Sequence, residues 1–550
     1  MLFIPSLSLR SVTSSVALTV LLFIIYKVIT AKLNGRRYRA ESARRGCAPA
    51  PTLHSKNVLG TSRLKESIKA TKEDRGPQYV VSAMNEVGTN IHTLRVPILD
   101  YELLVTRDPE NVKAMFSTQS SEYDISATRS SAFMPLLGEG IFTSTGEQWK
   151  HSRALVRPQF SREEISNLDL VERHVRTLMR VLAVNEKGWT ETVDLQPLMF
   201  YFTLDTATEF LYGQSVHSQA AIAGFESSKN GIDGAAFGKH FSTAKHLVDK
   251  RGALGKFYWL MRMGEMNMHC KAIHEVIDKM ILDRLENKKD PLSMEEKGTR
   301  KFVLLDELAK ETQDLKELRN ETLHTLMAGR DPTGALLGWV WYFLARHPDV
   351  FSKLRKIVLN QFGTSTSSPI NDFADLRRCE YLQWVIHEVV RIVAIIPMNE
   401  RVALKDTTLP RGGGADGSKP IFVRKGIQVL IPLYAIQHRL DIWGEDAEGF
   451  RPERWQGRRI GWEWIPFGGG ARKCLGRKSS QLRPVDDRIG VDELDTEQFA
   501  FTEASYCIVR MLQRFDIVQN MEGPGEMKLH TAIENRSGTG VMVRFREVSK

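Results

Sequence analysis

Residues 466–476 read Pro-Phe-Gly-Gly-Gly-Ala-Arg-Lys-Cys-Leu-Gly, and this stretch carries the strongest chemical signal in the 550-residue sequence. Its glycines allow a backbone loop to come close to a flat ligand. Arg472 places a cation two residues before Cys474, and a thiolate stays deprotonated when positive charge or backbone N–H groups lie nearby. A phosphate-binding loop is excluded because no Lys-Ser/Thr pair follows at the required spacing. The stretch therefore predicts a loop that presents the Cys474 thiolate to a ligand.

The loop resembles the haem-binding loop of the cytochrome P450 family. Phe467, Gly470, Arg472, Cys474 and Gly476 match the pattern Phe-x-x-Gly-x-Arg-x-Cys-x-Gly. The resemblance implies that the chain binds haem b, that Cys474 ligates the iron, and that Phe467, Arg472 and Gly476 contribute to cofactor binding. It extends over nearly the whole body and implies the cytochrome P450 fold, which is mainly α with small β-sheets.

A second pair of motifs predicts a structural triad behind this loop. Glu388-Val-Val-Arg391 lies in a helical stretch, so its two charged side chains share one helix face. Phe450-Arg-Pro-Glu-Arg-Trp455 follows, and the resemblance implies that Arg454 joins Glu388 and Arg391 in a buried group. An isolated Glu-x-x-Arg pair is usually a solvated ion pair, so this role depends on the resemblance.

Further cofactor-binding residues are expected upstream. In Trp149-Lys-His-Ser-Arg153, Trp149 and Arg153 lie one helical turn apart and face the same way. An indole N–H and a guanidinium can then meet one carboxylate, and the resemblance implies a haem propionate. Arg401 resembles a second propionate-binding arginine of the family. A surface tryptophan beside a surface arginine is the alternative interpretation for Trp149 and Arg153.

The oxygen-activating motif departs from the family pattern. The stretch Ala328-Gly-Arg-Asp-Pro-Thr333 lies inside an apolar helix, and an acid–alcohol pair such as Asp331 and Thr333 can relay protons. Pro332 stands where the family usually has a threonine, so we expect Asp331 and Thr333 to be the catalytic residues, with Thr333 substituting for the missing hydroxyl. The alternative is a plain helix kinked at Pro332.

Composition excludes several classes of protein. Hydrophobic residues make up 42% of the chain, charged residues 26% and aromatic residues 9%, which excludes a disordered tail protein, a collagen-like fibre and a disulfide miniprotein. The mean hydropathy of -0.27 excludes a polytopic membrane protein. The net charge of +10 permits a membrane surface as partner and does not by itself argue for nucleic acid, so no nucleic-acid partner is expected. The five cysteines show no zinc-type spacing.

Hydrophobic periodicity predicts a mainly helical body. Helical patterns dominate between Glu110 and Arg391, for example over residues 163–182 and 315–345. Strand-like stretches are short and lie at 101–105, 421–423 and 428–431. We expect three parts: a membrane anchor (1–30), a basic, proline-containing linker (31–51) and a single catalytic domain (52–550).

The N-terminal region predicts a single-pass membrane anchor. Sixteen uncharged residues separate Arg10 from Lys27, and the apolar stretch approaches the ~20 residues that span a bilayer if Lys27 snorkels. Six cations follow between Lys32 and Arg45, which favours the cytosolic side for what comes after. A cleaved signal peptide is the alternative, but no convincing cleavage site is present. We expect the endoplasmic reticulum membrane, with the catalytic domain in the cytosol.

Residues 477–497 interrupt the family pattern. In the family a helix follows the cysteine loop directly, commonly from Gln-Gln-Phe-Ala, and the matching stretch here begins only at Gln498. The polar residues between, with Pro484 among them, cannot continue a helix. Codons for Arg477-Lys-Ser and for Thr496-Glu497 can contain splice-donor and splice-acceptor sequences, and their removal would restore Gly-Gln-Gln-Phe-Ala. We hypothesise a retained intron, with a genuine surface loop as the alternative.

Together these observations predict a haem-thiolate monooxygenase. The resemblance implies that dioxygen and electrons from NADPH, delivered by NADPH-cytochrome P450 reductase, hydroxylate a hydrophobic small molecule; cytochrome b5 is a further candidate partner. Leu409–Gly417, Tyr434–Arg439 and Gly444–Glu448 resemble the fungal alkane and fatty-acid hydroxylase branch, which favours a long aliphatic substrate. The alternatives are a tailoring oxidase of fungal specialised metabolism, a haem-thiolate isomerase or dehydratase, and an inactive chain.

Overall fold

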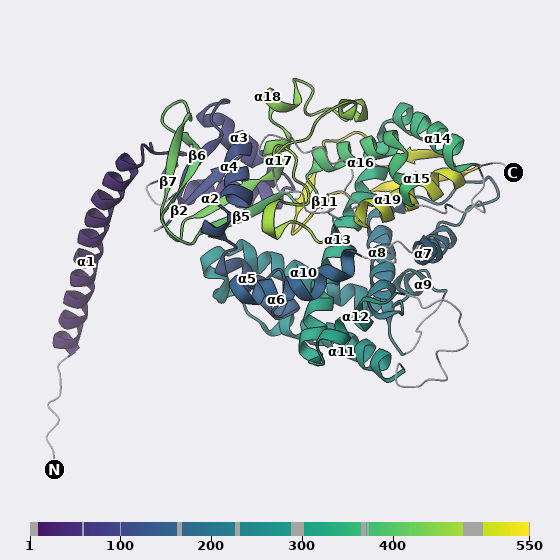
Figure 1. Cartoon of the computed structure of the whole chain (residues 1–550), viewed down its shortest axis with the longest axis horizontal. Helices are drawn as coiled ribbons and strands as arrows, with labels where there is room; N and C mark the ends of the chain where they lie inside the picture. Colours follow the sequence, from purple (N-terminus) through teal and green to yellow (C-terminus); the bar gives the residue numbers. More distant parts are fainter. Residues whose placement is uncertain are drawn as a thin grey trace, which may run out of the picture.

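Helices form most of the body, and small sheets lie toward both of its ends (Figure 1). The structure, a computed structural model, describes residues 9–57, 60–98, 101–161, 168–225, 231–287, 302–364, 370, 373–476 and 499–548. Residues 477–497, the suspected retained intron, lie outside this range. The expected mainly α fold with small β-sheets is confirmed.

The helices occupy these residues: α1 Leu9–Arg44, α2 Thr61–Lys72, α3 Gly76–Val87, α4 Pro109–Lys113, α5 Ala127–Leu137, α6 Gly146–Val156, α7 Leu168–Val181, α8 Leu195–Tyr212, α9 Ser218–Ile222, α10 Gly234–Ala253, α11 Gly264–Asn287, α12 Leu304–Glu311, α13 Leu315–Arg346, α14 Pro348–Phe362, α15 Phe373–Arg378, α16 Glu380–Val393, α17 Leu433–Gln437, α18 Leu440–Trp443 and α19 Phe499–Arg514. The helix predicted over 315–345 is therefore confirmed as α13.

The strands occupy these residues: β1 Thr93–Ile98, β2 Tyr101–Thr106, β3 Tyr123–Asp124, β4 Val193–Asp194, β5 Met398–Ala403, β6 Thr407–Gly413, β7 Lys419–Val423, β8 Gln428–Pro432, β9 Phe515–Asn520, β10 Leu529–Thr531, β11 Asn535–Ser537 and β12 Met542–Glu547. The largest sheet has the order β1-β2-β8-β5-β3, and the others pair β4-β12-β9, β6-β7 and β10-β11. The three strand-like stretches predicted from the sequence lie in β2, β7 and β8.

Helix α13 forms the centre of the body. Asp314 caps its N-terminus by accepting a hydrogen bond from the Lys316 N–H at 2.8 Å. Trp339 and Trp341 are almost fully buried in the core, and the Trp339 indole donates to the Asn535 carbonyl at 2.9 Å. The helix continues through Pro332 without interruption. It can therefore hold the motif at 328–333 in a fixed place.

Helix α1 projects away from the body (Figure 1), and it includes most of the residues predicted as a membrane anchor. After α1 ends, residues 46–53, which we call the strap, attach to two sheets. The Ala48 N–H donates to the Pro420 carbonyl at 2.9 Å, and the Leu53 N–H donates to the Arg95 carbonyl at 2.9 Å. Among the described residues, no helix combines the length and apolarity that a membrane crossing requires.

Candidate functional site

The predicted cysteine loop is a tight turn in the middle of the body. Gly468 and Gly470 have φ values of 68° and 62°, a region that favours glycine. A Cβ on Gly470 would lie 1.5 Å from the Phe116 carbonyl oxygen, so only glycine fits there. The Cys474 N–H donates to the Phe467 carbonyl at 2.9 Å, and the Cys474 side chain is exposed. The loop thus presents the cysteine, as the sequence predicted.

Phe467 and Gly476 are two further residues of this loop that were predicted to bind the cofactor. Phe467 packs edge-to-face against Phe501 of α19, with ring centroids 5.0 Å apart, so it fastens the loop to the helix behind it. Gly476 ends the described part of the loop, and its role in cofactor binding stays a prediction.

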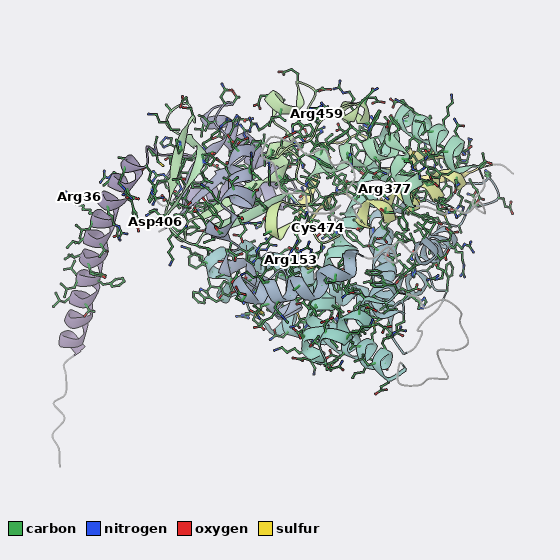
Figure 2. The ribbon with its side chains drawn as sticks, in the orientation of Figure 1. Arg36, Arg153, Arg377, Asp406, Arg459 and Cys474 are labelled. Carbon is green, nitrogen blue, oxygen red and sulfur yellow. The ribbon has the colours of Figure 1, made fainter. Side chains whose placement is uncertain are left out.

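Arginine side chains gather next to the cysteine loop. Figure 2 shows Arg153 and Cys474 near each other in the middle of the body, and Arg153 Nη1 donates to the Lys473 carbonyl at 3.1 Å. Arg153 and Arg472 both lie over the Trp149 ring, at 5.6 and 4.4 Å from its centroid. The structure therefore brings together the predicted residues of α6 and of the cysteine loop.

Arg401 of β5 joins the same group from the sheet side. It is only 5% exposed, lies 4.1 Å from the Phe116 ring centroid, and donates to the Glu400 carbonyl at 2.7 Å. Burial, together with the neighbouring Arg129 and Arg472, lowers the pKa of Arg401 to about 9. A buried cation with its pKa lowered in this way lies where an anion would stabilise it.

Arg129 of α5 belongs to the same group, and the sequence analysis missed it. Burial lowers the pKa of Arg129, and the Glu400 carboxylate acts in the opposite direction. Its stretch matches no motif, and its place beside Arg401 depends on a contact between segments about 270 residues apart. Only its position one helical turn after the Ser126 cap could have drawn attention to it.

The charge of this group is unbalanced. Four arginines (Arg129, Arg153, Arg401 and Arg472) accompany two acids. Asp124 pairs with Arg472 at 2.7 Å, while Glu400 accepts hydrogen bonds from Ser126 and Gln428. Among the described residues, no carboxylate forms an ion pair with the other three arginines. We call these four side chains the arginine pocket. Four positive and two negative charges leave an excess of two, which suits a ligand that carries two carboxylates.

The predicted oxygen-activating motif of α13 is buried. Asp331 is 1% exposed and pairs with Arg330 at 2.6 Å and with Lys245 at 3.5 Å. Thr333 is also 1% exposed, and its hydroxyl has no hydrogen-bond partner among the described residues. The structure therefore places no hydrogen bond between the two predicted catalytic side chains. The sequence analysis did not identify Lys245 of α10 as the partner of Asp331.

The predicted structural triad is confirmed. Glu388 and Arg391 are both fully buried and pair at 2.8 Å. Arg454 Nε lies 3.2 Å from Glu388 Oε1, and the Trp455 indole donates to Glu388 Oε2 at 3.0 Å. Arg391 also donates to the carbonyls of Gln437 and Ala447. The group therefore fixes α16 against the segment that leads into the cysteine loop.

Comparison with known proteins decides the family. The sequence model of the family described as "Cytochrome P450" matches residues 72–482. The chain belongs to the cytochrome P450 family. This P450 is 36% identical over 527 residues to "Cytochrome P450 monooxygenase g430" of Fusarium sp, which covers 95% of this chain and 88% of the relative. It is 40% identical to "Cytochrome P450 52A5" of Candida maltosa, with 82% of each chain covered.

The fold agrees with this assignment. The crystal structure of the cytochrome P450DA heme domain superposes on this P450 with a TM-score of 0.70 and covers 92% of this chain and 98% of its own, at 18% sequence identity. Family and fold together identify the chain as a haem-thiolate monooxygenase whose iron is held by a cysteine thiolate.

The residues of this P450 fit haem b. The cofactor carries two propionates, and the arginine pocket has an excess of two positive charges beside the exposed Cys474. A thiolate among arginines is stabilised by their charge, since nearby cations favour the deprotonated sulfur.

Proposed function

We propose that this P450 is a membrane-bound enzyme that uses reductase-supplied electrons to hydroxylate a hydrophobic substrate with a long aliphatic chain. The observation that carries the site assignment is the exposed Cys474 beside the arginine pocket. The substrate class is supported by the resemblance to the fungal alkane and fatty-acid hydroxylase branch in Leu409–Gly417, Tyr434–Arg439 and Gly444–Glu448.

Each part of the site has a task in this proposal. When bound, the haem supplies the oxygen-activating chemistry. Cys474 would ligate its iron, and the arginine pocket would bind its propionates and fix its plane. Thr333 Oγ1 is the buried hydroxyl that can take up and pass on a proton, because Pro332 contributes none. The Asp331 carboxylate forms ion pairs with Arg330 and Lys245, and it can stabilise a proton-carrying group nearby.

Electrons reach the site from a separate protein in this proposal. The sequence offers no flavin- or dinucleotide-binding motif, so an NADPH-cytochrome P450 reductase is the proposed donor, with cytochrome b5 as a second candidate. Lys473 lies beside Cys474 in the loop, and a basic surface there would attract an acidic partner.

Membrane association is part of the same proposal. The described apolar side chains of α1 are exposed, among them Leu22, Phe23 and Tyr26, and six cations lie between Lys32 and Arg45. A second apolar group lies at the 3₁₀ segment η5 (Gly255–Leu260), where Trp259 and Leu260 are exposed. Exposed apolar side chains such as these favour contact with lipid. The single-pass anchor over residues 1–30 and the cytosolic catalytic domain remain the proposed arrangement.

A tailoring oxidase of specialised metabolism is the second candidate. Relatives in Fusarium sp and in Alternaria solani are named cytochrome P450 monooxygenases, and a buried group of charged side chains beside the oxygen-activating motif favours a substrate with a polar group. An isomerase or dehydratase, which would consume no dioxygen, is separated from both candidates by measuring NADPH consumption and the incorporation of labelled dioxygen into the product.

The absorption spectrum of the reduced, carbon-monoxide-bound protein tests the site. It is recorded for the full chain and for a chain in which 477–497 are replaced by one Gln, and Cys474→Ser serves as the control that removes the thiolate. We expect the thiolate signature in the shortened chain and its loss in Cys474→Ser. The proposal fails if neither length of chain gives the signature. Equal signatures in both lengths contradict the retained intron, as does a mature transcript that keeps those codons.

A further inference from the structure

Five ionisable side chains gather next to the oxygen-activating motif, where a purely apolar substrate would need none. They come from three separate elements: α10, α13 and the turn between β10 and β11. Four of them are at most 3% exposed. We call this group the distal charge cluster, and its members are Lys245, Asp249, Arg330, Asp331 and Glu534.

The cations of the cluster are already paired. Arg330 Nη1 lies 2.6 Å from Asp331 Oδ1, and Arg330 Nη2 donates to the Ser242 hydroxyl at 3.0 Å. Lys245 donates to Glu534 Oε1 and lies 3.5 Å from Asp331 Oδ2. The ring of Phe200 lies against both cations, at 5.6 Å from Lys245 Nζ and 5.4 Å from Arg330 Cζ. These contacts leave the cations little freedom to move toward a new partner.

The carboxyl groups keep unused hydrogen-bonding capacity. Within the described residues, Asp249 Oδ2, Asp331 Oδ2 and Glu534 Oε2 accept no hydrogen bond, although each atom is buried. Buried polar atoms are almost always hydrogen-bonded, and an orphaned one costs free energy. Asp331 Oδ2 still has the Lys245 ammonium 3.5 Å away, so Asp249 Oδ2 and Glu534 Oε2 are the atoms that indicate a ligand or water with hydrogen-bond donors.

The charge of the cluster is balanced without a ligand. Burial, and then the Glu534 carboxylate, raises the pKa of Asp249 to about 8, so Asp249 is mostly protonated at neutral pH. Lys245 and Arg330 then balance Asp331 and Glu534. A negatively charged ligand group would disturb this balance, and because a carboxylate has no proton to donate, it would also leave Glu534 Oε2 without a donor.

We propose that the distal charge cluster recognises a hydroxyl group on an otherwise hydrophobic substrate. A hydroxyl donates one hydrogen bond and accepts others, and it adds no charge. An alkane end could neither donate nor accept, and it would leave the buried oxygens orphaned. This inference depends on the proposed function, and it narrows the substrate from aliphatic chains in general to chains that carry an alcohol.

The test compares three ligands that differ only at one end: hexadecane, hexadecanol and hexadecanoic acid. Each is titrated into whichever chain, full or shortened, gives the thiolate-ligated haem signature, and binding is followed by the shift of the haem absorption band. We expect hexadecanol to bind about tenfold or more tightly than hexadecane, the effect of one hydrogen bond to a charged acceptor, and hexadecanoic acid to bind more weakly than hexadecanol. If hexadecane bound as tightly as hexadecanol, water alone would supply the hydrogen bonds to the free carboxyl oxygens, and the hydroxyl inference would be wrong.

Two variants assign the effect to the cluster. In Glu534→Gln the amide oxygen can still accept from Lys245, while the free carboxyl oxygen becomes a donor, so the preference for hexadecanol should fall severalfold. Asp249→Ala removes the second carboxyl group with an unused oxygen and is used if Glu534→Gln does not fold. Glu453 pairs with Lys353 at the surface. Glu453→Gln is therefore the matched control, and it should keep the wild-type preference for hexadecanol over hexadecane.

The outcomes separate the two proposals. Loss of the thiolate signature in all chains contradicts the proposed function itself. A normal signature with hexadecanol bound no better than hexadecane, or not bound at all, overturns the hydroxyl inference alone.

Discussion

The surroundings of Arg401 support the proposed haem site. It is buried among other arginines, and among the described residues no carboxylate pairs with it. In the protein without haem, burial and the neighbouring cations make its charge unfavourable, as its lowered pKa of about 9 indicates. The same charge becomes favourable next to a propionate. In the proposed site, Arg401 is therefore a cofactor-binding residue that reduces the stability of the empty protein.

Replacement of Arg401 should change stability and cofactor binding in opposite directions. Arg401→Leu removes an unfavourable buried charge, so we expect the haem-free protein to melt at a higher temperature. Haem binding should weaken roughly tenfold or more, because one charge-assisted hydrogen bond is lost. Thermal unfolding and the haem content of purified protein measure the two effects. Arg411→Leu, at an exposed position on β6, should change neither; a fall of both quantities in Arg401→Leu would contradict this role.

Asp249 predicts a pH dependence of stability. Its pKa is raised from 3.8 to about 8 in the folded protein, so the folded state holds this proton more tightly than the unfolded state. The contribution of Asp249 to stability is therefore lost as pH rises from about 4 to about 8 and is constant above that range. In Asp249→Asn the decline of the melting temperature with pH should be shallower. Asp283 is half-exposed on α11, and Asp283→Asn should keep the wild-type slope. A wild-type slope in Asp249→Asn would contradict the raised pKa of Asp249.

The residues that could be identified from the sequence are those whose motif partners lie within a few positions of them. Cys474 and Gly470 stand in one short loop, and Glu388 and Arg391 stand one turn apart on one helix. Lys245 could not be found, because its partner Glu534 lies 289 positions away and a lysine in a helix usually faces solvent. Buried charges that meet only through tertiary contacts leave no periodic signal.

At the scale of elements, α16 and the segment after α18 are joined by the triad of Glu388, Arg391 and Arg454. Long elements such as α13 and α16 could be predicted because their apolar periodicity persists over many residues. The two-residue strands β3 and β4 could not, since each exists only through pairing with a distant strand, β4 with β12 for example. Element length thus decided what the sequence could predict.

Breaking the triad should destabilise this P450 strongly. Arg391→Met leaves the Glu388 carboxylate buried with fewer partners, and loss of one member of a buried pair typically costs ~3–5 kcal/mol. Arg176→Met removes an exposed partner of Glu172 on α7, where an exposed pair contributes at most ~1 kcal/mol. Denaturant unfolding of both variants provides the comparison. Equal losses of unfolding free energy in the two variants would show that the buried triad stabilises the fold no more than an exposed ion pair does.

For the whole molecule, membrane association should depend on α1. A chain that begins at Arg45 lacks the exposed apolar side chains of α1, so we expect most of it to stay in the supernatant when the full chain sediments with phospholipid vesicles. A full-length variant with Leu21→Asn and Leu22→Asn should sediment less than the wild type, while Leu64→Asn, an exposed position on α2, should not. Full retention of the truncated chain on vesicles would contradict an anchoring role for α1.

The strap has a consequence for how this P450 meets other proteins. Because residues 46–53 are hydrogen-bonded to two sheets, the catalytic body cannot swivel freely at the end of α1, a rod of about 54 Å. Once α1 is held in a bilayer, the cysteine loop keeps a restricted angle and height above the lipid. An electron donor in the same bilayer then has only to diffuse laterally, and two-dimensional confinement raises its effective concentration without any new contact.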